Sequence, residues 1–109
     1  MSQSLAWILL VLSGLVDVAW AFATKRSNGF SEPTWGLASL VLLAMFIGLL
    51  VKALQVLPLG TAYAVWTGIG AVGTLAVGML VLGESPEPIR LIFAGVTILG
   101  IVGLKVSGS

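Results

Sequence analysis

The sequence contains no cysteine and no histidine, and few of its side chains carry a charge. The absence of both residue types excludes disulfides, thiol nucleophiles, imidazole bases and the usual zinc sites. Charged residues make up 8% of the chain and the net charge is +1, so there is no basic patch of the kind that binds nucleic acid. We therefore expect no metal, no cofactor and no nucleic-acid partner, and we predict that the protein is not an enzyme.

Apolar residues, in contrast, are present in large excess. They account for 59% of the sequence, and the mean hydropathy is +1.17, which is outside the range of ordinary soluble domains. A bilayer core about 30 Å thick needs roughly 20 residues of helix. Four runs have that length, at residues 5–24, 34–54, 61–83 and 89–106. Because lipid tolerates no open sheet edge and four runs are too few for a closed barrel, we predict an all-α membrane protein with four transmembrane helices.

The connections between these runs are short and contain all the prolines, namely Pro33, Pro58, Pro86 and Pro88. Proline is disfavoured inside helices by its missing N–H and by its ring, so these positions support the predicted boundaries. No segment is long or polar enough to form a second domain. We therefore interpret residues 1–109 as one four-helix transmembrane domain, in a multi-pass protein of the inner cell membrane.

The positive charges give these helices no preferred orientation. Cytoplasmic loops normally carry an excess of lysine and arginine. One end of the predicted bundle has Lys25, Arg26 and Arg90, and the other end has Lys52, Lys105 and the terminal amine. That balance predicts insertion in both orientations, so that two copies meet antiparallel in one membrane. The alternative is a single orientation that some other signal sets.

Four helices of this length leave most of their surface against lipid and enclose no substrate chamber alone. Helices associate in membranes through small residues and interhelical hydrogen bonds. The fourth run offers Thr97, Gly100 and Gly103, which we predict as dimer contacts. The expected assembly is an antiparallel homodimer, with a heterodimer as the alternative. The ordinary enrichment of glycine in membrane helices is the simpler explanation of these residues.

The first run contains one acid, Asp17, within a turn of its centre. On insertion scales a carboxylate there opposes membrane insertion by roughly 2.5–3.5 kcal/mol, so an acid at such a position is by default a candidate functional residue. Ser13, Gly14 and Trp20 lie three or four positions away and share its helix face. We predict that this face binds a cation and protons. The alternative is a protonated aspartate that only hydrogen-bonds to a neighbouring helix.

The third run has a similar helix face, with polar, aromatic and small residues. Its members recur at three- and four-residue spacing and are Tyr63, Trp66, Thr67, Gly70 and Thr74. An acid facing aromatic rings suits a small organic cation, because the carboxylate supplies charge and hydrogen-bond acceptors while the rings supply cation–π attraction. Tyr63 and Trp66 are accordingly predicted to bind the substrate, and ordinary packing is the alternative for both.

Burial also affects the protonation of Asp17. Desolvation favours the neutral form of a carboxyl group, and a second Asp17 from the partner would favour it further. Such a pair holds either protons or a cation, but not both well. Combined with a site that opens alternately to each side, this competition predicts proton-coupled antiport of the cation. The other charged residues, among them Glu84 and Arg90, are predicted to be solvated loop acids and interfacial anchors.

Four stretches of the chain are those of a known family: GLVDVAWAFATKRSNGF, LPLGTAYAVWTGIGAVG, LGESPEPIRL and GIVGLK. From Leu5 to about Lys105 the chain resembles the small multidrug resistance transporters, most closely their guanidinium-exporter branch. The resemblance implies an antiparallel dimer that exports a cation in exchange for protons, with the first three spans lining the chamber and the fourth dimerising. It also implies that Asp17 stands in place of the family's essential acid. The positions that match the family's binding site are Gly14, Trp20, Tyr63 and Trp66.

Two positions depart from the family pattern. The essential acid of the family is a glutamate, whereas Asp17 is one methylene shorter, which withdraws the carboxylate by roughly one C–C bond. The guanidinium branch often has a serine on the second span where this chain has Phe46, so Phe46 is a further predicted site residue. The expected substrate is guanidinium or a substituted guanidine. The alternatives are another small cation, multidrug export of quaternary ammonium compounds, or a non-transporting subunit of a heterodimer.

Overall fold

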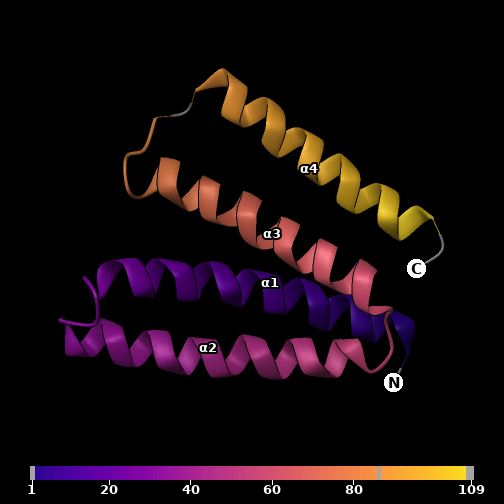
Figure 1. Cartoon of the computed structure of the whole chain (residues 1–109), viewed down its shortest axis with the longest axis horizontal. Helices are drawn as coiled ribbons and strands as arrows, with labels where there is room; N and C mark the ends of the chain where they lie inside the picture. The colour runs from indigo at the N-terminus through magenta and orange to yellow at the C-terminus, as the bar shows by residue number, and fades with distance from the viewer. Residues whose placement is uncertain (1, 86, 108–109) are drawn as a thin grey trace.

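The structure is a computed structural model that describes residues 2–85 and 87–107. This part of the chain forms four helices and no strand: α1 (Gln3–Arg26), α2 (Pro33–Leu54), α3 (Leu59–Leu80) and α4 (Pro88–Val106) (Figure 1). Each helix is long and apolar enough to cross a membrane. The prediction of an all-α protein with four membrane-spanning helices is confirmed.

Polar and proline residues define where the helices begin. Ser2 caps α1, and its hydroxyl accepts a hydrogen bond of 3.1 Å from the backbone N–H three residues further on. Pro33 and Pro88 are the first residues of α2 and α4, where a missing N–H leaves no helical hydrogen bond unmade. Pro58 immediately precedes α3. The remaining proline, Pro86, lies outside the described residues.

α3 ends three residues earlier than the predicted apolar run, which extends to residue 83. The helix ends at Leu80, and the chain reverses through Gly83, whose φ of +74° lies in the left-handed region that glycine adopts without strain. The N–H of Glu84 then donates to the carbonyl of Gly78 at 2.9 Å. This turn folds the start of the α3–α4 connection back over the last turn of α3.

The helices form a thin slab with extents of 43 × 34 × 16 Å. α1 packs against both α2 and α3, and α4 lies along α3 (Figure 1). Near the end of α4, Nζ of Lys105 lies 5.1 Å from the ring centroid of Trp7 in α1. The main apolar cluster lies where α1 begins, α2 ends and α3 begins. Its members are Ala6, Trp7, Leu10, Ala53, Leu57, Ala62 and Val65. Leu10 lies about two turns before Asp17, so this cluster holds α1 firmly on its neighbours close to the predicted site.

The fourth helix has no buried residue in the described structure. Gly100 and Gly103 face open space, because a Cβ built at either position meets no atom within 4 Å. Thr97 differs, since its methyl group would lie 3.3 Å from a Cβ built on Gly68 of α3. Gly100 and Gly103 are therefore accessible to a second copy, while Thr97 packs within its own chain. The dimer contacts at all three residues stay predictions.

Candidate functional site

Asp17 is partly buried on the side of α1 that faces α3. Gly70 makes this position possible, because a Cβ built there would lie 2.5 Å from Oδ2 of Asp17. Within the described part of the chain, no group forms a hydrogen bond or an ion pair with this carboxylate. Asp17 therefore does not join α1 to another helix of its own chain, which was the structural alternative to a binding role.

A cavity of about 560 Å³ opens beside the carboxylate, between α1, α3 and the start of α4. It is lined by Asp17, Trp20, Ala21, Thr67, Gly70, Ala71, Thr74, Leu75, Glu84 and Arg90. Its volume falls within the range of roughly 300–1,000 Å³ that is typical of small-molecule sites. The lining combines a carboxylate, hydroxyl groups and an indole ring, which are the groups that contact a small polar cation.

The predicted aromatic residues form a row that connects three helices. The ring centroids of Trp20 and Phe46 are 5.6 Å apart, and those of Phe46 and Trp66 are 5.7 Å apart. The row continues to Tyr63, whose ring centroid lies 5.7 Å from that of Trp66. At these distances aromatic rings attract one another. Trp20 is the member that lines the Asp17 cavity, and the other three rings do not line it.

The indole N–H of Trp66 is buried, and no group in the described chain accepts a hydrogen bond from it. Buried indole N–H groups usually have an acceptor. The ring itself is well packed, since it stacks on Phe46 with an interplanar angle of 29°. An acceptor from outside the chain would complete this group, which favours a binding role for Trp66 over packing alone.

Ser13 and Gly14 share the helix face of Asp17 but do not line its cavity. The hydroxyl of Ser13 is fully buried and donates to the carbonyl of Phe46 at 2.8 Å, which joins α1 to α2. Gly14 faces α3, where an added Cβ would lie 2.6 Å from Cγ2 of Ile69. In this structure both residues set the spacing between α1 and its neighbours, and their direct binding role stays a prediction.

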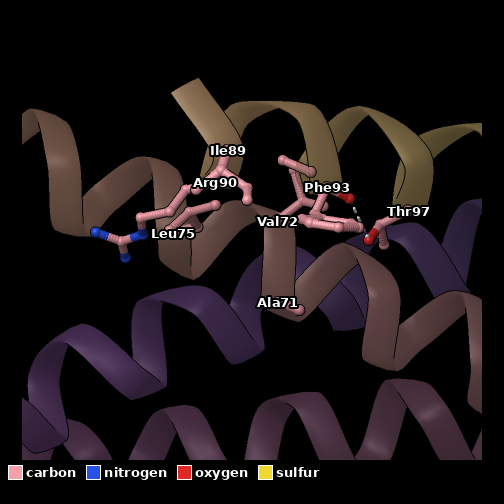
Figure 2. A pocket seen from close by; sticks show the side chains of 8 residues that line it. Ala71, Val72, Leu75, Ile89, Arg90, Phe93 and Thr97 are labelled. Atoms are coloured by element: carbon pink, nitrogen blue, oxygen red, sulfur yellow. Dashed lines mark hydrogen bonds between the residues drawn. The ribbon is translucent and has the colours of Figure 1, made fainter. Parts of the chain in front are cut away.

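The cavity is also lined by two charged residues, Glu84 and Arg90. From the sequence alone, Glu84 is predicted to be a solvated loop acid and Arg90 an anchor at the membrane interface. Nη2 of Arg90 lies 3.3 Å from Oε1 of Glu84, and Nη1 of Arg90 donates to the carbonyl of Ser85 at 3.0 Å. Figure 2 shows the Arg90 side chain leaving α4 and extending past Leu75 of α3. The two charges are six residues apart in the sequence, and this separation does not by itself predict the pair, because it spans a connection without helical periodicity.

Arg90 also lines a second pocket, of about 320 Å³, between α3 and α4 (Figure 2). Its other lining residues are Ala71, Val72, Leu75, Ile89, Phe93, Ala94 and Thr97. This pocket is almost entirely apolar, so it lacks the acceptors that a small cation needs. The cavity beside Asp17 is the better candidate for a cation site.

Comparison with known proteins agrees with the resemblance seen in the sequence. Residues 5–106 match the family described as Small Multidrug Resistance protein. A relative from Yersinia pseudotuberculosis named guanidinium exporter is 50% identical over 103 residues, which cover 94% of this chain and 99% of the relative. Guanidinium exporters from Salmonella typhimurium strain LT2 and from Klebsiella oxytoca are 46% identical over 103 residues, covering 94% of this chain and 98% of each relative. The chain therefore belongs to the small multidrug resistance family, and its four apolar helices make it a multi-pass protein of the inner membrane.

Proposed function

We propose that this protein exports a small organic cation, guanidinium or a substituted guanidine, in exchange for protons, and that it works as an antiparallel dimer. The observation that carries the proposal is Asp17, a carboxylate in a membrane-spanning helix that lines a cavity beside Trp20 and has no partner in the described chain. The relatives supply the substrate class, since they are named guanidinium exporters.

The groups around the cavity match the chemistry of a guanidinium ion. This ion is planar, carries one positive charge and donates hydrogen bonds along its edges. A carboxylate such as that of Asp17 accepts two of these bonds in parallel, which adds geometric selectivity to charge attraction. Trp20 offers an aromatic face for cation–π contact, and Thr67 and Thr74 offer hydroxyl oxygens on α3. The cavity volume of about 560 Å³ leaves room for substituents on the guanidine.

Exchange with protons follows from the charge of the site. Without a ligand, Asp17 is an anion in a membrane-spanning helix, and this is the unfavourable state. Bound protons or a bound cation reduce this negative charge, so the loaded forms change their exposure across the membrane more readily than the empty form. Because the two Asp17 carboxylates of the dimer hold either protons or a cation, but not both well, protons return inward as the cation leaves.

The dimer is proposed because one chain leaves both its surface and its cavity uncovered. The slab is 16 Å thin, α4 has no buried residue, and the cavity is open on one side. A second copy in the opposite orientation would cover α4 at Gly100 and Gly103. It would also supply the pair of oppositely oriented units on which alternating access commonly depends.

The proposal is tested by transport of the purified protein in liposomes under an imposed proton gradient. We expect guanidinium to drive proton movement, and tetraalkylammonium ions to give a weaker signal. Proton movement with tetraalkylammonium ions alone would instead identify a multidrug exporter. No transport by the pure chain, with recovery when a homologue is co-expressed, would identify one half of a heterodimer. Guanidinium transport without proton movement would contradict antiport.

The dual orientation can be measured with single introduced cysteines, since the chain has none of its own. Ser31→Cys and Gln55→Cys place an exposed thiol at opposite ends of the bundle. We expect roughly half of the molecules to react with an impermeant reagent at each position, because the positive charges favour neither orientation. Complete protection of one position and complete labelling of the other would rule out the antiparallel dimer.

Phe46 favours a second candidate function, export of quaternary ammonium compounds. Phe46 is 6% exposed and lies between the rings of Trp20 and Trp66, so the part of the aromatic row from Trp20 to Trp66 has no ring hydroxyl group. Such a row suits cations with apolar substituents better than it suits plain guanidinium.

Phe46→Ser, alone and combined with Asp17→Glu, is expected to shift transport toward plain guanidinium. The expected change in the ratio of guanidinium to alkylguanidinium rates is roughly tenfold, as for the loss of one apolar contact in a binding pocket. Phe22→Ser is the matched control, because Phe22 pairs with Trp35 and lies outside the aromatic row. An unchanged ratio in the Phe46 variants would mean that this residue does not determine selectivity.

A further inference from the structure

The cavity beside Asp17 contains a second carboxylate, that of Glu84. The Glu84 side chain is 45% exposed, so it lies at the mouth of the cavity rather than within it. Its partner is the guanidinium group of Arg90, at 3.3 Å. The mouth is therefore lined by a carboxylate that already binds a guanidinium group, supplied by the chain itself.

Glu84 is held against α3 by its own backbone and by a glycine. Its N–H donates to the carbonyl of Gly78 at 2.9 Å. A Cβ built on Gly78 would lie 2.5 Å from Oε1 and 2.9 Å from Oε2 of Glu84, so only glycine leaves room for the carboxylate at this place. The position of the carboxylate thus depends on Gly78 as that of Asp17 depends on Gly70.

Three residues of α3 connect the two carboxylates along one helix face. Gly70, Thr74 and Gly78 follow one another at four-residue spacing, which places them on the same side of the helix. Asp17 lies over the first and Glu84 over the last. Eight residues of helix correspond to about 12 Å. A guanidinium ion is too small to contact both carboxylates at once, so the cavity offers it two successive positions, with the hydroxyl of Thr74 between them.

We propose that Glu84 is an outer docking residue for the cationic substrate, and that Arg90 occupies it while no substrate is bound. This inference rests on the proposed export of a guanidinium-type cation. The Glu84–Arg90 pair is half-exposed, and pairs of this kind contribute little to stability, so an arriving cation can displace the Arg90 guanidinium. While paired, the two side chains are neutral together, so Arg90 does not repel the cation from the mouth of the cavity.

Transport kinetics of Glu84→Gln test the proposal. We expect the half-saturating guanidinium concentration to rise about fivefold at low ionic strength, as for the loss of one partly exposed charge contact, and less at high salt. The maximal rate should stay within about twofold, because Asp17 still carries out the exchange. Glu87→Gln is the matched control: Glu87 precedes α4 in the same connection but does not line the cavity.

Gly78→Ala separates the position of the carboxylate from its charge. The variant keeps the charge of Glu84 but forces the carboxylate away from α3, and alanine is well tolerated in a helix. We expect the same rise in half-saturating concentration as in Glu84→Gln. If both variants behave like Glu87→Gln, or if they lower the maximal rate without changing the half-saturating concentration, Glu84 is not a docking residue.

A binding measurement distinguishes failure of this inference from failure of the proposed function. In Asp17→Asn protein, titration with guanidinium should still shift the NMR signals of Gly78 and Glu84. The shifts should vanish in the Asp17→Asn, Glu84→Gln double variant. If wild-type protein transports no guanidinium but these shifts occur, the proposed export is wrong and the outer site stands. If wild-type protein transports guanidinium and the Asp17→Asn protein shows no shifts, the outer site is wrong and the proposed export stands.

Discussion

Replacement of Asp17 by asparagine is expected to abolish guanidinium-driven proton movement while the protein remains folded in the membrane. Asparagine has nearly the size and shape of aspartate but does not ionise, so it neither attracts the cation nor carries the exchanged proton. The loss of two charge-assisted hydrogen bonds, at about 1.5–3 kcal/mol each, weakens cation binding at least about a hundredfold. Proton flux in proteoliposomes measures the effect, and helicity and elution volume verify folding.

Two comparisons make the result for Asp17 specific. Glu32→Gln removes an acid from the exposed residue before α2, outside the cavity, and is expected to leave transport unchanged. Addition of guanidinium to weakly buffered wild-type protein should release protons, and the same addition to the Asp17→Asn protein should release none. Proton-coupled transport that persists in Asp17→Asn would exclude this carboxylate as the site of exchange.

The helices are largely predictable from the sequence, for a reason particular to membranes. Every backbone polar group within lipid must be bonded inside its own segment, so length and hydropathy alone identify a spanning helix. The end of α3 is not predictable in this way. The predicted run continues to Gly83, whereas the helix ends at Leu80, because the end is set by the turn at Gly83 and by the hydrogen bond from Glu84. Hydropathy contains no information about either contact.

The site is predictable in part, because helical spacing defines a face but not the neighbour that covers it. Asp17 and Trp20 do line one cavity, as their spacing indicates. Ser13 and Gly14 share that spacing, yet they contact α2 and α3, since the contacts depend on how the helices cross.

The positions of Glu84 and Arg90 could not be predicted from helical spacing at all. Each lies in or next to a connection between helices, where no helical periodicity applies. The turn at Gly83 folds Glu84 back onto α3, and Arg90 reaches it from the first turn of α4. The three-dimensional structure of that turn is therefore needed to place the two charges at the mouth of the Asp17 cavity.

Gly70→Ala is expected to impair transport through the addition of one methyl group. Alanine is a better helix former than glycine by about 0.8–1 kcal/mol, so α3 itself should not be weakened. The new Cβ would lie 2.5 Å from Oδ2 of Asp17, well inside van der Waals contact, so the carboxylate must rotate away from α3. We expect at least about a tenfold rise in the half-saturating guanidinium concentration, since one charge-assisted hydrogen bond is worth about 1.5–3 kcal/mol.

Two other glycines provide the contrasts that this prediction needs. Gly48→Ala in α2 adds the same methyl group where it meets no atom within 4 Å, so transport should not change. Gly14→Ala meets Cγ2 of Ile69 at 2.6 Å, in the packed contact between α1 and α3, so it should lower the thermal stability of the protein rather than affect only substrate affinity. Gly70→Ala should instead lower the affinity for guanidinium and leave the thermal stability nearly unchanged. The group that its methyl displaces is the end of the Asp17 side chain, which can rotate. If Gly70→Ala binds guanidinium with wild-type affinity, the cation does not bind the Asp17 carboxylate in the position that it occupies beside Gly70.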